Sequence, residues 1–104
     1  MNIQFNTDSH ISGNNELTQR LRENLINSLS KYEGKITTLE VHLSDENAHK
    51  PGQKDKRCML EARVANIKPI AVTSFDNSID QAVNAAIIKL TSAIDSTLGR
   101  MSTH

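Results

Sequence analysis

Cysteine and aromatic residues are scarce in this chain, which has one Cys, no Trp and only 3% aromatic residues. A single cysteine excludes an intramolecular disulfide, so the chain suits a reducing compartment. No apolar stretch approaches the roughly 20 residues that a membrane-spanning helix needs. The first residues also lack the basic region and apolar run of a secretory signal. We therefore expect a cytoplasmic protein that does not enter a membrane.

A surplus of either charge is also absent, because 12 Lys and Arg residues balance 12 Asp and Glu residues. Nucleic-acid-binding domains usually carry a basic surplus, although a net charge says nothing about how the charges are distributed. The length of 104 residues, of which 37% are hydrophobic, suits one globular domain. We expect that domain to span residues 1–101 and residues 102–104 to form a disordered tail.

The first third of the chain predicts a strand followed by a helix. Ile3 and Phe5 alternate with polar residues, as in a half-buried strand. A turn over residues 10–15 supplies an Asn N-cap, and a helix is predicted from Glu16 to Tyr32, before Gly34. The apolar stripe of this helix consists of Leu17, Leu21, Leu25, Leu29 and Tyr32.

The rest of the chain predicts three strands and a second helix. The strands cover residues 37–44, 56–64 and 69–75, separated by a polar loop over 45–55 and a tight turn over 65–68. Ser78 and Gln81 have the spacing of a capping box at the start of the second helix, which ends near Gly99. Its core face consists of Ile79, Val83, Ala86, Ile87, Leu90, Ala93, Ile94 and Leu98.

The resulting order is β-α-β-β-β-α. Strands with one apolar face and helices with one apolar stripe must cover each other. We therefore predict an α+β fold in which a four-stranded sheet has two helices packed on one face. The other face of the sheet is expected to be open to water or to a partner, and it carries His42, Arg57, Glu61 and Arg63.

Candidate catalytic and metal-binding residues are few. Cys58 is expected on the inward face of its strand, as a buried structural thiol rather than an activated nucleophile. Asp45, Glu46 and His49 lie close together in the polar loop but match no standard zinc or calcium spacing. The glycines are isolated, so no phosphate-binding loop is present. We predict no catalytic residue, no metal, no cofactor and no small-molecule substrate.

The charges on the two helices point to a binding surface. Each helix carries a line of basic and hydrogen-bonding side chains that is free of acids, while Asp80 and Asp95 lie on a different flank. Such lines suit phosphate oxygens, although an ordinary solvated helix face has the same pattern. The first line consists of Arg20, Asn24, Asn27 and Lys31, and the second of Ala85, Lys89, Ser92, Ser96 and Arg100.

Two further features are candidates for contacts. A second basic cluster, which neighbouring acidic residues dilute, consists of Lys50, Lys54, Lys56 and Arg57. Ile88 projects almost opposite the core face of its helix, as a contact residue or as one of the single exposed apolar residues that are common on protein surfaces.

The ordered set of segments resembles the ribosome hibernation-promoting factors, the ribosome-associated inhibitors also known as sigma-54 modulation proteins. The resemblance covers nearly the whole chain in a short form of the family, without the long C-terminal extension of some members. The segments that carry it are Ile3-Gln4-Phe5, Ile11-Ser12-Gly13-Asn14, Glu16-Leu17-Thr18, Ile36-Thr37, Val41-His42-Leu43-Ser44, Ser78-Ile79-Asp80-Gln81-Ala82-Val83 and Lys89-Leu90.

The resemblance implies a fold like that of double-stranded-RNA-binding domains. It also implies binding to the small ribosomal subunit and its rRNA in the mRNA–tRNA channel, which would inhibit translation mechanically. Family contacts to rRNA come largely from basic helix residues. The candidate RNA-binding residues here are Arg20, Arg22, Lys31, Lys54, Lys56, Arg57, Lys89 and Arg100.

Two departures leave alternatives open. The chain ends without the lysine cluster that family members often carry after the last helix, and its net charge is zero. We therefore expect a shallow salt dependence of RNA binding. The alternative is a protein-interaction module on the same fold that has lost tight rRNA binding, such as a homodimer formed through the open sheet face or Ile88. An enzymatic alternative would rest on Cys58 and scattered histidines alone.

Overall fold

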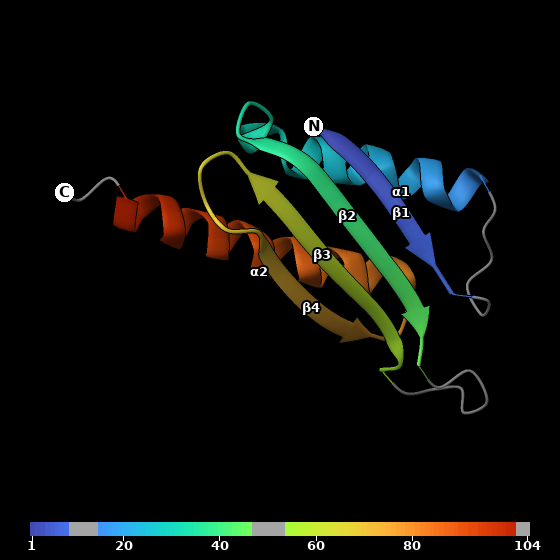
Figure 1. Ribbon diagram of the computed structural model, residues 1–104. Coiled ribbons are helices and arrows are strands. Elements are labelled where there is room, and N and C mark those ends of the chain that lie inside the picture. Colours follow the sequence, from blue (N-terminus) through green and yellow to red (C-terminus); the bar gives the residue numbers. More distant parts are fainter. Residues whose placement is uncertain (9–14, 47–53, 102–104) are drawn as a thin grey trace.

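The described residues follow the predicted order of elements (Figure 1). The computed structural model describes residues 1–8, 15–46 and 54–101, so the predicted turn before the first helix, most of the polar loop with His49, and the predicted tail lie outside the described residues. The elements are β1 (Asn2–Thr7), α1 (Asn15–Ser28), the short 3-10 helix η1 (Ser30–Tyr32), β2 (Ile36–Asp45), β3 (Lys56–Val64), β4 (Ile70–Asp76) and α2 (Ile79–Met101).

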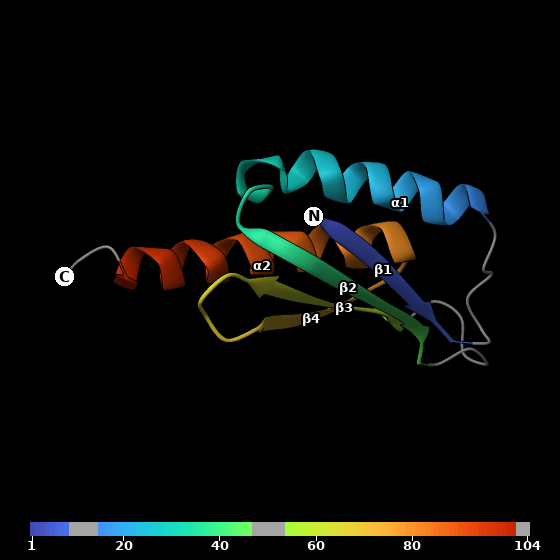
Figure 2. The same ribbon diagram turned by 45° about the horizontal axis from the view of Figure 1, so that its top comes forward.

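The four strands form one mixed sheet in the order β1-β2-β3-β4. The first pair, β1 and β2, is parallel because α1 carries the chain back between them, and the other two pairs are antiparallel. Both helices lie on one face of the sheet and leave its other face open (Figure 2). The predicted α+β fold is therefore confirmed.

The core lies between the helices and the covered face of the sheet. Leu21 and Leu25 of α1 are fully buried, as are Leu29, which follows α1, and Leu90 and Ile94 of α2. Burying a side chain of this size stabilises the fold by about 1.5–3 kcal/mol relative to leaving it exposed. The two apolar stripes are therefore the main reason why both helices stay on the sheet.

A bulge at the start of β2 adds a residue to this core. Leu39, Val41 and Leu43 point inward as predicted, and strict alternation would turn Ile36 outward. The register between β2 and β3 shifts between Ile36 and Thr38, so Ile36 pairs with Val64 and is only 2% exposed. Strand alternation read from the sequence missed Ile36 because a bulge reverses the alternation on one side of it.

The first helix ends earlier than predicted. The sequence predicted one helix to Tyr32, but α1 ends at Ser28 and the chain continues as the tighter η1. In η1 the amide of Tyr32 donates to the carbonyl of Leu29 at 2.9 Å, three residues back. Because side chains three residues apart eclipse each other in a 3-10 helix, Leu29 and Tyr32 both point into the core.

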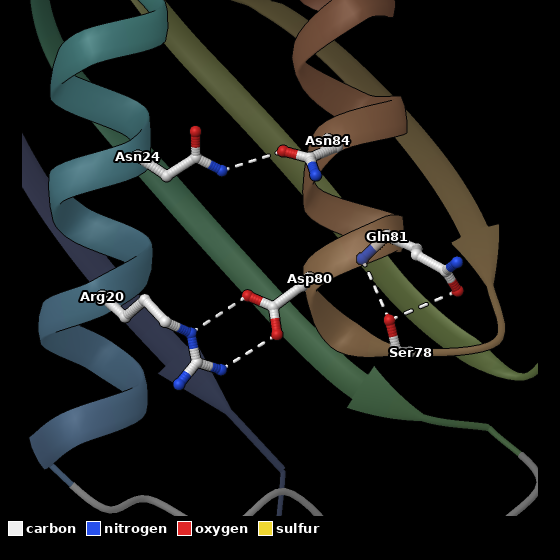
Figure 3. Close-up of polar contacts among 6 residues, drawn as sticks. All are labelled: Arg20, Asn24, Ser78, Asp80, Gln81 and Asn84. Atoms are coloured by element: carbon white, nitrogen blue, oxygen red, sulfur yellow. Dashed lines mark hydrogen bonds and ion pairs between the residues drawn. The ribbon is translucent and has the colours of Figure 1, made fainter.

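The ends of the other elements agree closely with the predicted chemistry. At the start of α2, the amide of Gln81 donates to the Ser78 hydroxyl at 3.1 Å, and that hydroxyl donates to the Gln81 side chain (Figure 3). The predicted cap is therefore present. In the turn between β3 and β4, Asn66 has φ 69°, a left-handed conformation that Asn tolerates better than most residues.

Tyr32 joins the end of η1 to α2. Its ring is 3% exposed, and its hydroxyl donates to Asp95 of α2 at 2.5 Å. Burial first, and then the hydrogen bond and negative charge of Asp95, raise the pKa of Tyr32 to about 12 from its ordinary value of 10.0.

Within the described residues, neither helix is both long and apolar enough to cross a membrane.

This environment predicts a delayed ionisation of the single tyrosine. Because Tyr32 is the only Tyr and the chain has no Trp, absorbance at 295 nm reports this one group. The midpoint should lie near 12 in the folded protein and near 10 in urea. Since the folded pKa is the higher one, the associated stability is fully present below pH 10 and is lost as the pH rises through 12.

The variant Asp95→Asn separates the two causes. It removes the negative charge but leaves the ring buried, so its midpoint should fall below that of the wild type and stay above 10. A folded wild-type protein that titrates at the same pH as the urea-unfolded chain would contradict this assignment.

Candidate nucleic-acid interface

The predicted line of polar residues on α1 faces α2. Arg20 pairs with Asp80, its Nε lying 3.3 Å from Oδ1 and its Nη2 2.9 Å from Oδ2, and Asn24 donates to Asn84 at 2.9 Å (Figure 3). Farther along the same line, Lys31 lies 3.7 Å from Asp95. We name this row of contacts the helix seam. Its first pair raises the pKa of Arg20, chiefly through the hydrogen bond to Asp80.

In the helix seam, Asp80 and Asp95 of α2 pair with basic residues of the first line, Arg20 and Lys31. The sequence placed Asp80 and Asp95 on a flank of α2 that differs from the basic line of that helix. The helices run side by side in the same direction (Figure 1), so that flank of α2 lies against the basic line of α1. Helical spacing alone could not reveal this, because it gives no information about how two helices are rotated against each other.

Two other candidate cations lie at the edges of the sheet. Arg22 donates to the carbonyl of Ile3 in edge strand β1 at 3.2 Å, and its guanidinium lies 5.2 Å from the centre of the Phe5 ring. Lys89 donates to the carbonyl of Thr73 in edge strand β4 at 2.8 Å. Basic side chains that occupy edge carbonyls oppose pairing with a further strand.

The basic cluster beside the polar loop is held by acids. Lys56 bridges Asp45 at 3.2 Å and Asp55 at 3.1 Å, and these two hydrogen bonds raise its pKa. Arg57 lies 3.7 Å from Glu46. Lys54 is exposed, and within the described residues it has no hydrogen bond or ion pair.

Four exposed cations gather at one end of the molecule. The turn from η1 into β2, the turn between β3 and β4, and the last turns of α2 lie together at the end where α2 extends past the sheet (Figures 1 and 2). The amide of Ala65 donates to the carbonyl of Lys35 at 3.3 Å, which joins the first two of these segments. We name this region the basic end and define it by Lys31, Lys35, Lys68 and Arg100.

The charge distribution of the molecule is therefore uneven. The segments of the basic end, residues 30–35, 65–69 and 95–101, carry those four cations against the two acids Glu33 and Asp95. The opposite end has the reverse balance among its described residues: Lys54, Lys56 and Arg57 against Asp8, Asp45, Glu46, Asp55 and Asp76. A neutral chain thus has one end better suited to phosphates than the described residues of the other end.

Two residues of the basic end, Lys35 and Lys68, were missing from the candidates. Both are exposed, and neither side chain forms a hydrogen bond or ion pair with another described residue. The signal that could have found them is topological. Antiparallel strands β2 and β3 put the start of one beside the end of the other, so the two flanking turns, each with a lysine, lie at the same end of the sheet.

The described residues lack two features that are common in catalytic sites. They enclose no ligand-sized pocket, and they include no group of three or more His, Cys, Asp and Glu side chains arranged to hold a metal ion. Cys58 is fully buried among core residues, as predicted. Burial raises the pKa of its thiol to about 12, against a smaller opposing effect of Arg57.

Comparisons with known proteins identify the relatives of this chain. Residues 9–102 match the family model described as Sigma 54 modulation protein / S30EA ribosomal protein. The N-terminal domain of Protein Y from Thermus thermophilus is similar in structure, with a TM-score of 0.71 and 14% identity over 93% of this chain and 99% of that one. A ribosomal subunit interface protein from Coxiella burnetii has a TM-score of 0.73 and 13% identity over 95% and 99%. No curated protein sequence matches at a significant level.

The environment of Cys58 predicts an unreactive thiol. A thiol with a pKa of about 12 holds almost no thiolate at pH 8, and the thiolate is the nucleophile. The native protein should therefore not react with Ellman's reagent at pH 8 within an hour, whereas the protein in urea should release one equivalent of colour. A rapid native reaction would contradict the buried position and would reopen the enzymatic alternative.

Proposed function

This chain belongs to the Sigma 54 modulation protein / S30EA ribosomal protein family, and we propose that it is a ribosome-associated translation inhibitor. It binds the small ribosomal subunit in the channel that mRNA and tRNA use, and it inhibits by occupying that space. The name of the similar Coxiella burnetii structure, a ribosomal subunit interface protein, supports a partner of this kind. The binding occurs in the cytoplasm, where ribosomes work.

The chain is not an enzyme, because the family consists of non-enzymatic ribosome-associated modulators. Inhibition by occupancy needs only affinity and a rigid body. The protein is a short rod with principal extents of 50 × 25 × 19 Å, held together by one core. A rod of this kind can fill a channel without any chemical step.

The basic end is the observation that supports RNA as the partner. Its four cations come from three separate segments, and Lys35 and Lys68 are held by no acid among the described residues. Lysine and arginine side chains contact the phosphate backbone without reading its sequence. With about four phosphate contacts on single-stranded RNA, the logarithm of the binding constant should fall with a slope of about −3 against the logarithm of salt concentration.

This proposal predicts where substitutions release the protein from ribosomes. Lys35→Glu and Lys68→Glu, made singly, should each weaken binding to purified small subunits and reduce the salt slope by about 0.7. Both side chains are exposed in turns, so both variants should keep the circular dichroism and melting temperature of the wild type. Binding is measured by co-sedimentation through sucrose cushions between 50 and 200 mM salt, with about 50 mM as the most favourable condition.

The matched control is Lys54→Glu, the same change at an exposed lysine of the opposite end. It should bind like the wild type. Release by Lys54→Glu, with Lys35→Glu and Lys68→Glu unchanged, would place the contact beside the polar loop instead. A wild-type protein that fails to travel with small subunits or whole ribosomes at low salt would contradict the proposed function.

The second candidate function is a protein-interaction module, in one form a homodimer through the open sheet face. The observation that favours it is Phe75, which is 47% exposed and stands on that face in register with Arg57. Sedimentation velocity separates the two. The ribosome-binding proposal expects a monomer, whereas this module expects a dimer at micromolar concentration that Phe75→Glu disrupts.

A further inference from the structure

The contact between Arg20 and Asp80 has the geometry of a phosphate contact. The guanidinium presents two N–H groups side by side, and each meets a different carboxylate oxygen, at 3.3 and 2.9 Å (Figure 3). Arginine uses the same fork on the oxygens of a phosphate. The Arg20 and Asp80 side chains are 58% and 50% exposed, so a phosphate outside the protein can approach the same guanidinium.

The second charged contact of the helix seam repeats this arrangement with a lysine. Lys31 is 74% exposed and lies 3.7 Å from Asp95. The carboxylate is held in place by the hydroxyl of Tyr32 at 2.5 Å, so it stays beside the lysine. Both basic residues of the α1 line are thus accompanied by a carboxylate of α2.

We infer that Asp80 and Asp95 compete with RNA phosphates for Arg20 and Lys31, and that this competition limits the affinity of the chain for RNA. The inference rests on the proposed function, because it concerns how the same protein binds the same partner. It assigns a role to two acids that would otherwise only join the helices. In a chain with 12 acids and 12 bases, it also means that Arg20 and Lys31 are only partly available to phosphates.

Either the carboxylate or an RNA phosphate can bind the cation, because exposed ion pairs are weak. Such a pair is equivalent to about a two- to fivefold change in a binding constant. The seam also keeps its uncharged contact when a carboxylate is displaced, since the bond between Asn24 and Asn84 involves no charge. The helices therefore stay packed while Arg20 turns to a phosphate.

The test removes one competing charge and measures RNA binding. Asp80→Asn should bind small ribosomal subunits and polyuridylate about two- to fivefold more tightly than the wild type at low salt. Its salt slope should become steeper by up to about 0.7, since one more phosphate is neutralised. Asp95→Asn should act in the same direction through Lys31, and thermal unfolding verifies that each variant is folded.

Two controls separate this competition from a general loss of negative charge. Glu23→Gln changes the net charge by the same amount on the exposed face of α1, at a side chain without a hydrogen bond or ion pair to another described residue. It should bind more weakly than Asp80→Asn and close to the wild type. In the double variant Arg20→Gln with Asp80→Asn, the gain should disappear because the freed cation is absent.

The outcomes are distinct. A gain in Glu23→Gln equal to that in Asp80→Asn, or a gain that survives in the double variant, overturns the competition while wild-type binding leaves the proposed function intact. If Asp80→Asn binds no more tightly than the wild type, the competition is likewise overturned and the proposed function stays intact. If neither the wild type nor any variant binds small subunits at low salt, the proposed function fails and the inference fails with it.

Discussion

The structure depends on covering one apolar face of a four-stranded sheet with two helices. Cys58, Leu60 and Ala62 of β3 are fully buried, and exposing such a face to water would cost more free energy than a domain of this size holds in reserve. Neither helix alone spans the sheet, so both must lie side by side on the same face. The adjacent flanks of α1 and α2 then have to be compatible, and the helix seam meets that requirement with polar contacts.

Many bases of the chain are used in contacts within the fold. Arg20 and Lys31 join the helices, Arg22 and Lys89 occupy carbonyls of the two edge strands, and Lys56 joins two acids at the opposite end. Each contact is weak on its own. Together they fix the orientation of helices and strands, because hydrophobic packing in the core is not directional. Of the exposed lysines without a side-chain partner among the described residues, Lys54 lies at the opposite end, whereas the turns that carry Lys35 and Lys68 meet at the basic end.

This division links the fold to the proposed function. A family of ribosome-associated proteins needs a surface for RNA phosphates, and a neutral chain can supply one only by separating its charges in space. The basic end provides that separation at one pole of an elongated body. Asp80 and Asp95 of the helix seam limit phosphate binding further, because they compete for Arg20 and Lys31 with any phosphate that approaches α1.

Local sequence patterns determined the elements, the direction of each strand residue from Leu39 to Val64, the Ser78 cap and the buried state of Cys58, because each depends on side chains only a few positions apart. The inward turn of Ile36 and the end of α1 at Ser28 escaped because a bulge and a 3-10 turn change the periodicity itself. Only the tertiary structure decided which cations are free. Arg20 meets Asp80 from 60 residues away, and the rotation of one helix against another is set by packing, which no spacing within either helix records.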